Sequence, residues 1–541
     1  MITVTAVLTH WGLINIGHHL LHSDFAPSWL FSDDVRAGRW TAFQYQMSYA
    51  GVGLTYLRAL WMSFYEGLMG WDYFRGQSIF SYIWSPVLIT WGAYFVSRSY
   101  LKSRIAALIS GILAACGLQF WIDQYANDTY VAYLFLGCIL LGMRARVINP
   151  WTDWNGWRLV VAGILSGFAV YTSRISLIFL MSVWVPWTEI GPALQELWKM
   201  RTGRRWQQTL FGLGCLFFSL FAYLEALGPS IGHWGGREIK IHATPNLKFA
   251  LFCWFITLAP HYWNQLKGER LISLVKNLAV FTGAFCIGFL PEIIHVWNTH
   301  VFSEGTQGNR NFSDFLVVLA GLHRAIHSLL TASPDDSLQR IPALILLFGS
   351  VLLIRQSRKN AYLLPLIASA ILTIFAFCRV HNYAGPEPRY LIPLFPWIWV
   401  AWGSAVEWTL QKNRLLWATL LGALLVYQFA FHASAKRQLI LDTLRENRFD
   451  QKMAIIEKFR AENIRVVISD DYWNSNEYSV FSRGNPWFVP AKMQHLTPPQ
   501  AIDLSHSEKR IGWMTSQPLH PSMEIEKNLG TWFGKNIYIK N

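Results

Sequence analysis

The residues best suited to chemistry are two adjacent carboxylates, Asp33 and Asp34, which follow the first apolar segment of the chain. Three basic or aromatic residues come soon after them, Arg36, Arg39 and Trp40. A carboxylate that is partly removed from water has a raised pKa and can take a proton from a hydroxyl or amine nucleophile. The pair therefore predicts a general base, with its neighbour binding the acceptor or a cation. A solvated turn is the alternative.

Two arginines are candidates for binding a phosphate. Arg174 lies inside an apolar stretch, and Arg389 stands just before another one, close to His381 and Glu387. A cation at membrane depth is costly and is by default a functional candidate. The guanidinium group can bind a phosphate through two parallel hydrogen bonds. The alternatives are an arginine that caps a broken helix at Arg174 and a snorkelling side chain at Arg389.

Asp128 precedes Thr129 at the start of an apolar segment, where helix capping is the expected role. The sequence contains no P-loop, GxSxG, HExxH or CxxC motif. His18, His19 and His22 do not gather on one helix face, so no metal site is predicted there. No cofactor is predicted, and a divalent cation is left open.

The composition is that of a membrane protein. The 541 residues are 53% hydrophobic and only 14% charged, whereas soluble domains carry about 25% charged residues. The apolar residues form repeated segments of the length that crosses a bilayer, about 20 residues each. We therefore expect an all-α polytopic membrane bundle of about 11–13 spanning helices. The 28 Trp and 21 Tyr suit such a protein, since their rings favour the headgroup level.

The charge of the chain does not indicate a nucleic-acid-binding protein. The net charge is +14, but the basic residues fall in short clusters between apolar segments. Such clusters mark the cytoplasmic side of a membrane protein. All six cysteines lie in apolar segments, so no disulfide framework is expected.

Alternation of basic clusters with the other loops predicts the layout. Residues 1–434 would form the transmembrane domain, with a long first outer loop at about 22–81 and a surface helix at Val52–Leu68. The start, Ile2–Leu21, is expected to be a first spanning helix rather than a cleaved signal, and whether residues precede it is left open. Further spans are expected near 82–97, 105–122, 129–143, 159–185 with a break at Thr172–Arg174, 206–227, 247–263, 277–297, 341–354, 361–378, 390–410 and 414–432.

The last part of the chain, residues 435–541, has ordinary charge density. An amphipathic stretch at Met453–Glu462 predicts a helix, and Ile464–Ile468 predicts a buried strand. We expect a small α/β extracytoplasmic domain on the same side of the membrane as Asp33 and Asp34.

Taken in order, these features resemble the GT-C superfamily, membrane glycosyltransferases that use polyprenyl-phosphate sugars. The superfamily includes protein O-mannosyltransferases and aminoarabinose transferases that act on lipid A. The resemblance rests on the acidic pair, on Asp128 and on four short motifs. Tyr45–Gly53 is similar to YGQxYxG, and Gly163–Ser173 is similar to GxxxGLAxxt. Arg389–Pro396 is similar to RYllPllP, and Asn463–Phe481 is similar to a strand region with the pattern yadYWxxYxltF. Two departures are an Asp-Asp pair in place of Asp-Glu and the absence of the KPP motif, with Ser48–Ala50 near that place.

The resemblance implies an inverting enzyme in which Asp33 or Asp34 is the general base. The residues expected to bind substrate or phosphate are Arg174, Arg389, Asp128, Tyr49, His381 and Glu387. Because the lysine of the KPP motif is absent, Arg174 and Arg389 become the stronger candidates for binding the phosphate. The implied partners are a polyprenyl-phosphate sugar donor, membrane lipids and a lipid, glycan or protein acceptor, but no nucleic acid. The implied location is a bacterial inner membrane, with the active site facing the periplasm or the cell exterior.

Two other classes of function remain. One is a transporter, flippase or polymerase of lipid-linked saccharides that lacks this transfer site. The other is a scaffold subunit that binds the lipid-linked sugar without turning it over.

Overall fold

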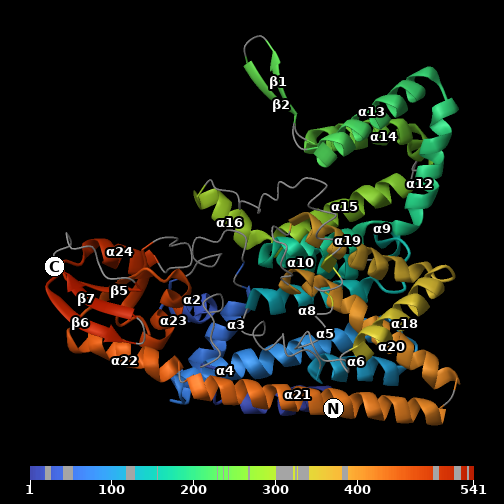
Figure 1. The fold of residues 1–541 in the computed structure, drawn as a ribbon. Helices are drawn as coiled ribbons and strands as arrows, with labels where there is room; N and C mark the ends of the chain where they lie inside the picture. The colour runs from blue at the N-terminus through green and yellow to red at the C-terminus, as the bar shows by residue number, and fades with distance from the viewer. Residues whose placement is uncertain are drawn as a thin grey trace.

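The computed structural model describes most of the chain. The description leaves out residues 19–25, 40–50, 52, 117–127, 155, 228–229, 235–236, 242, 266–268, 300–320, 323–325, 327–339, 381–387, 413, 447, 492–498, 517–524, 533–534 and 541. The described part is mainly helical, with a small sheet near its C-terminal end (Figure 1).

Short helices open the chain and lead into one long helix. The elements are α1 (Ile2–His10), η1 (Trp11–Leu13), α2 (Ala26–Arg36), α3 (Gly53–Met62), η2 (Ser63–Leu68), α4 (Tyr73–Ile79), η3 (Phe80–Trp84) and α5 (Ser85–Tyr100). The last three form one continuous helix of 28 residues, Tyr73–Tyr100. It begins earlier than the predicted span because Asp72 caps its first turn, accepting a hydrogen bond from the Arg75 backbone N–H at 2.7 Å.

The central elements are α6 (Arg104–Cys116), α8 (Asp128–Arg144), α9 (Pro150–Asp153), α10 (Gly156–Thr172), η4 (Arg174–Ser176), α11 (Leu177–Trp184), α12 (Trp187–Lys199), η5 (Met200–Thr202), α13 (Arg205–Leu227), β1 (Ser230–Trp234), β2 (Arg237–Ile241), α14 (Ala243–Gln265), α15 (Glu269–Gly288) and α16 (Leu290–Thr299). The predicted break at Thr172–Arg174 is confirmed, since α10 ends at Thr172. Between the predicted spans 206–227 and 247–263, the chain forms an antiparallel hairpin of β1 and β2.

Helices α10 and α15 pack closely through glycines. A Cβ added to Gly167 would lie 2.1 Å from the Phe285 carbonyl oxygen, and one added to Gly288 would lie 2.0 Å from that of Ile164. Small residues let two helix backbones approach each other in this way. This contact explains the second glycine of the GxxxG pattern in α10.

The remaining helices of the bundle are α18 (Arg340–Ser357), α19 (Leu364–Val380) after η7 (Ala361–Leu363), α20 (Phe395–Lys412) after η8 (Pro388–Leu394), and α21 (Arg414–Glu446). Helix α21 has 33 residues, about 50 Å at 1.5 Å per residue. It runs along the bundle to the C-terminal domain (Figure 1). The composition change at residue 435 therefore falls within a continuous helix.

Two described helices are long and apolar enough to cross a membrane, Tyr73–Tyr100 and Ala361–Cys378. The number rises to four if each of two bent pairs is one span; these pairs bend by 68° after Trp184 and by 66° after Gly288. Several other apolar helices are shorter, because breaks and turns divide the apolar segments. The predicted total of about 11–13 spans stays a prediction.

The C-terminal domain contains a five-stranded mixed sheet in the order β4-β3-β5-β7-β6. Its elements are α22 (Arg448–Ala461), β3 (Val466–Ser469), α23 (Tyr472–Ser482), β4 (Trp487–Pro490), α24 (Pro499–Ser507), β5 (Ile511–Thr515), β6 (Lys527–Trp532) and β7 (Lys535–Lys540). The predicted helix and strand at its start are confirmed. The motif after Asp471, which we assigned to a strand region, is wrong in this respect: it forms helix α23, capped by the Asp471 carboxylate.

The C-terminal domain shares a hydrophobic core with the first helices of the chain. Trp29, Phe31 and Val35 of α2 belong to the same buried cluster as Ile456 of α22 and Phe481 of α23. Burial of apolar surface is the main force that holds such parts together. The segment that carries Asp33 and Asp34 is therefore fixed by residues from both ends of the sequence.

Candidate active site

Asp33 and Asp34 lie in the last turns of helix α2 rather than in an irregular loop. Consecutive residues of a helix point about 100° apart, so the two carboxylates have different surroundings. The Asp33 side chain is 28% exposed. Asp34 is buried, with 4% of its surface exposed. Only Asp33 is therefore open enough to meet a substrate without a rearrangement.

Asp33 accepts hydrogen bonds from two neighbours. The Tyr73 hydroxyl donates to its Oδ2 at 2.7 Å, and Arg36 Nη1 lies 3.4 Å from its Oδ1. Removal from water raises the pKa of Asp33 from 3.8 to about 6, although Tyr73 and the nearby arginines oppose the shift. A carboxyl group with this pKa is ionised at neutral pH and is a stronger base than an ordinary aspartate.

Asp34 is held by groups that come from opposite ends of the chain. Its Oδ1 accepts hydrogen bonds from Arg39, at 3.0 Å from Nε and 2.5 Å from Nη2, and from Gln500 Nε2 at 2.8 Å. Gln500 belongs to α24 of the C-terminal domain. This geometry suits a residue that positions the end of α2.

A row of alternating charges extends from Asp33 to the C-terminal domain. Arg36 Nη1 lies 2.7 Å from Glu66 Oε2, and Arg483 Nη2 lies 2.8 Å from Glu66 Oε1. The Arg483 guanidinium also lies over the Tyr73 ring, 4.4 Å from its centroid. The hydrogen-bond donor of Asp33 is thus in direct contact with a residue of the C-terminal domain.

A second charged pair lies in the interior next to α2. Arg58 is fully buried and binds both carboxylate oxygens of Asp128, at 2.9 Å from Nε and 2.6 Å from Nη2. Arg58 Nη1 also donates to the side chain of Gln77 at 3.1 Å, and Gln77 Nε2 donates to Ser32 Oγ at 3.0 Å. The pair therefore joins α3, α4 and α8 to the residue that precedes Asp33. The substrate-binding role expected for Asp128 stays a prediction.

Arg174 stands directly after the break between α10 and α11. Its guanidinium pairs with Glu292 of α16, and Nη1 donates to the Val170 carbonyl at 3.4 Å. Glu292 is buried, whereas Arg174 is 28% exposed. The Gly51 backbone N–H donates to the Thr172 carbonyl at 3.1 Å, which joins the first loop to this break. A Cβ at Gly51 would lie 2.4 Å from the Tyr171 oxygen, so the glycine of the YGQxYxG-like motif allows this close approach.

The structure does not test the other predicted site residues. Tyr49, His381 and Glu387 lie outside the described residues, and for Arg389 only the backbone is described, within η8. Within the described part of the chain, no group of three or more His, Cys, Asp or Glu side chains could hold a metal ion.

Sequence reasoning missed the partners of the acidic pair. Arg58 and Glu66 interrupt the apolar stretch Val52–Leu68, and that interruption is the signal that could have identified them. The sequences around Tyr73, Arg483 and Gln500 contain no comparable interruption of an apolar stretch.

Comparison with known proteins gives a match in structure only. No family model and no curated protein sequence matches the chain. A crystal structure of ArnT from Cupriavidus metallidurans in the apo state aligns with a TM-score of 0.51 and 13% identity, covering 95% of this chain and 93% of that one. The chain shares the fold of ArnT.

Two further alignments have lower TM-scores. ArnT bound to undecaprenyl phosphate gives 0.49 at 12% identity, covering 99% of this chain and 97% of that one. An oligosaccharyltransferase from Archaeoglobus fulgidus, in complex with Zn and sulfate, gives 0.48 at 13% identity, covering 95% of this chain and 68% of that one. The resemblance read from the motifs is therefore accompanied by a likeness in fold to ArnT, at 13% identity.

Proposed function

We propose that the protein is an inverting membrane glycosyltransferase that uses a polyprenyl-phosphate sugar as donor. The observation that carries the proposal is the partly exposed carboxylate of Asp33, whose pKa is raised to about 6, in a chain with the fold of ArnT. The motifs that resemble GT-C enzymes supply the donor class. The proposal also includes the predicted total of about 11–13 membrane-spanning helices.

In the proposed reaction, Asp33 takes the proton of the acceptor's hydroxyl or amine group. The acceptor atom forms a bond to the anomeric carbon of the sugar while the bond from that carbon to the phosphate oxygen breaks. The electron pair of the broken bond leaves with the polyprenyl phosphate. A single displacement of this kind inverts the anomeric centre.

Arg174 is proposed to stabilise the leaving phosphate, together with Arg389. Fixed donors that face a developing anion can be worth several kcal/mol. Arg174 is partly exposed at the helix break that Gly51 joins to the first loop, and its guanidinium group has five N–H donors. Tyr49, His381 and Glu387 remain proposed contacts of the substrate.

A cavity between α18, α20 and α21 has the polarity of a lipid site. It has a volume of about 710 Å³, and its walls include Phe348, Val406, Leu420 and Leu424. Such walls suit an isoprenoid or acyl chain better than a sugar. We propose that the lipid chain of the donor lies between the helices in this way.

The direct test is transfer of label from radioactive polyprenyl-phosphate sugars. Membranes that contain the wild type, Asp33→Asn or Asp503→Asn would receive these donors and a host extract as acceptor. Asp503 is an exposed acid of α24 and serves as the matched control. Transfer that is lost only in Asp33→Asn would support the base. Equal transfer in all three would remove Asp33 from the mechanism, and uptake of donor without transfer would favour a transporter.

A further inference from the structure

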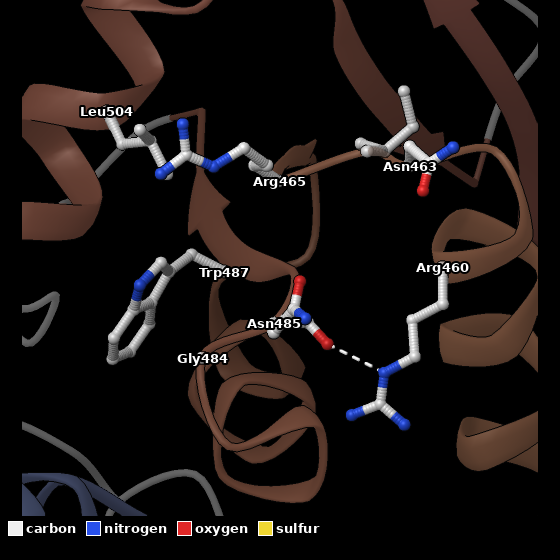
Figure 2. A pocket seen from close by; sticks show the side chains of 8 residues that line it. Arg460, Asn463, Arg465, Gly484, Asn485, Trp487 and Leu504 are labelled. Atoms are coloured by element: carbon white, nitrogen blue, oxygen red, sulfur yellow. Dashed lines mark hydrogen bonds between the residues drawn. The ribbon is translucent and has the colours of Figure 1, made fainter.

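A cavity in the C-terminal domain is separate from the acidic pair. It has a volume of about 620 Å³, within the range of small-molecule sites, and none of its lining residues belongs to the site described above. Figure 2 shows its lining side chains, among them Arg460, Asn463, Arg465, Asn485 and Trp487. They come from the end of α22, the segment that leads into β3, the loop between α23 and β4, and the first residue of β4.

One wall of the cavity is fixed by Arg460. Its Nε donates to the Asn485 carbonyl at 2.8 Å (Figure 2). Its Nη2 donates to the Ser482 carbonyl, also at 2.8 Å. These bonds tie the loop between α23 and β4 to α22. The cavity therefore has a rigid border, and Arg460 serves as part of that border.

Two of the remaining polar side chains, both amides, are available to a ligand. Across the described residues, the side-chain amides of Asn463 and Asn485 make no hydrogen bond. Each amide offers two N–H donors and one carbonyl acceptor. Arg465 is 68% exposed and pairs with Glu508 at 2.7 Å, an exposed contact that an anion could replace at little cost.

Trp487 supplies an aromatic surface beside these groups. A Cβ at Gly484 would lie 2.5 Å from the indole Cζ2 atom, so the ring rests directly on this glycine. Gly484 has a φ of +74°, a conformation that favours glycine. Both the backbone shape and the position of the ring therefore depend on Gly484.

An aromatic ring, two amides and an exposed guanidinium together match the chemistry of an acidic saccharide. The C–H face of a sugar ring packs on an indole, hydroxyl groups exchange hydrogen bonds with amides, and a carboxylate or phosphate pairs with arginine. We propose that this cavity binds an anionic saccharide of the acceptor. The inference rests on the proposed function and adds the class of acceptor to it.

The position of the cavity in the chain supports this role. Arg483, which binds Glu66 and covers Tyr73, directly precedes Gly484 and Asn485. One short loop thus contacts the surroundings of Asp33 and also forms part of the cavity wall. An acceptor sugar held in the cavity would be bound by the same loop that contacts the candidate base.

Binding can be measured on the full-length protein in lipid nanodiscs, without donor. Saturation-transfer NMR with digalacturonic acid as the anionic probe and cellobiose as the neutral probe reports contact with the sugar ring. We expect tighter binding of digalacturonic acid. Trp487→Ala should weaken it at least tenfold, and Arg465→Gln should remove the preference for the anionic probe. Lys509→Gln removes an exposed charge of the same domain away from the cavity and should change nothing.

Asn463→Gly provides a second variant in case Trp487→Ala does not fold. Asn463 has a φ of +55°, which glycine adopts readily, so this change removes the amide and keeps the backbone. We expect a loss of affinity of about fivefold to tenfold, the value of one hydrogen bond of about 1 kcal/mol or slightly more. The proposed site would be overturned if neither probe received saturation transfer. It would also be overturned if transfer were equal in the wild type, Trp487→Ala and Asn463→Gly.

A transfer assay separates this inference from the proposed function. If the cavity binds acceptor, Trp487→Ala should raise the KM for acceptor and leave the KM for donor unchanged. An unchanged acceptor KM would overturn the acceptor assignment while the glycosyltransferase reading stands. Binding of digalacturonic acid that depends on Trp487, in a protein that transfers no sugar, would support the saccharide site and count against the proposed function.

Discussion

Arg483 of the C-terminal domain forms an ion pair with Glu66, with Nη2 and Oε1 2.8 Å apart. Glu66 in turn binds Arg36, which lies beside Asp33. The C-terminal domain therefore contributes a positive charge to the electrostatic environment of the candidate base.

Opposite pH shifts are expected when the two members of this pair are neutralised. The positive charge of Arg483 lowers the pKa of Asp33, and the negative charge of Glu66 raises it. Arg483→Gln should therefore move the ascending limb of the pH–rate profile to higher pH, and Glu66→Gln should move it to lower pH. The measurement is the transfer rate from pH 4.5 to pH 8, with Lys509→Gln, which removes an exposed positive charge of the same domain, as the control. Shifts in the same direction would contradict the described network.

Asp33→Asn is expected to reduce transfer by about 100-fold to 10,000-fold, the range for loss of a general base. In the wild type, activity should rise with pH through about 6, because the base form of Asp33 is the ionised one. Initial rates of label leaving the lipid fraction would measure both effects.

The stability of the same variant separates a catalytic role from a structural one. The folded protein holds the Asp33 proton more tightly than the unfolded chain, so ionisation of Asp33 lowers stability as pH rises from 3.8 to about 6. Asp33→Asn cannot ionise, and its melting temperature above pH 6 should be equal to or higher than that of the wild type. A clear decrease would indicate that Asp33 mainly stabilises the fold.

Asp128→Asn should mainly destabilise the protein. Asp128 neutralises the fully buried Arg58 through two hydrogen bonds. Removal of one partner of a buried ion pair typically costs about 3–5 kcal/mol. Thermal unfolding of purified protein would show this loss. A variant with normal stability and lost transfer would instead support the substrate-binding role predicted from the sequence.

Arg174→Lys and Arg174→Gln should both reduce transfer, by roughly 100-fold for glutamine, if this group stabilises the leaving phosphate. Lysine keeps the charge but loses the planar fork, so an intermediate rate is expected. Glu292→Gln is the control, since it removes the partner of Arg174 and leaves the guanidinium in place. A rate that drops equally in all three variants would show that the pair is structural.

Cysteine labelling tests the orientation. Ser32 and Ser475 are fully buried, so exposed positions are better targets, such as Ala37 and Ser507 on the proposed outer side and Lys102 on the other. Lys102 follows the far end of the helix Tyr73–Tyr100, whose 28 residues extend about 42 Å. In a cysteine-free background, an impermeant reagent applied outside should label Ala37→Cys and Ser507→Cys but not Lys102→Cys. Labelling of Lys102→Cys alone would reverse the topology.

The sequence was sufficient for features that depend on local composition. The acidic pair, the break before Arg174 and the helix and strand that begin the last domain follow from residue type and periodicity within short windows. The helix after Asp471 was missed because one capping carboxylate outweighs the strand preference of Tyr478 and Val480.

The surroundings of the acidic pair could not be predicted. Asp34 and Gln500 are 466 positions apart, and Arg483 is almost as distant from Asp33. Tertiary packing alone brings these residues together, and no periodic pattern records it. The different environments of Asp33 and Asp34 also arise from this packing, which is why the sequence left open which of them is the base.

The shared core of α2 and the C-terminal domain constrains the order in which the protein can mature. Ribosomes add about 5–20 residues per second, so the apolar side of α2 waits roughly 20–90 s between its own synthesis and that of Gln500. During that time Trp29 and Phe31 lack their later partners. A chain that stops early would expose these side chains to chaperones and proteases and would lack the groups that surround Asp33. The apolar side of α2 can therefore be fully buried only after the C-terminal domain has been translated.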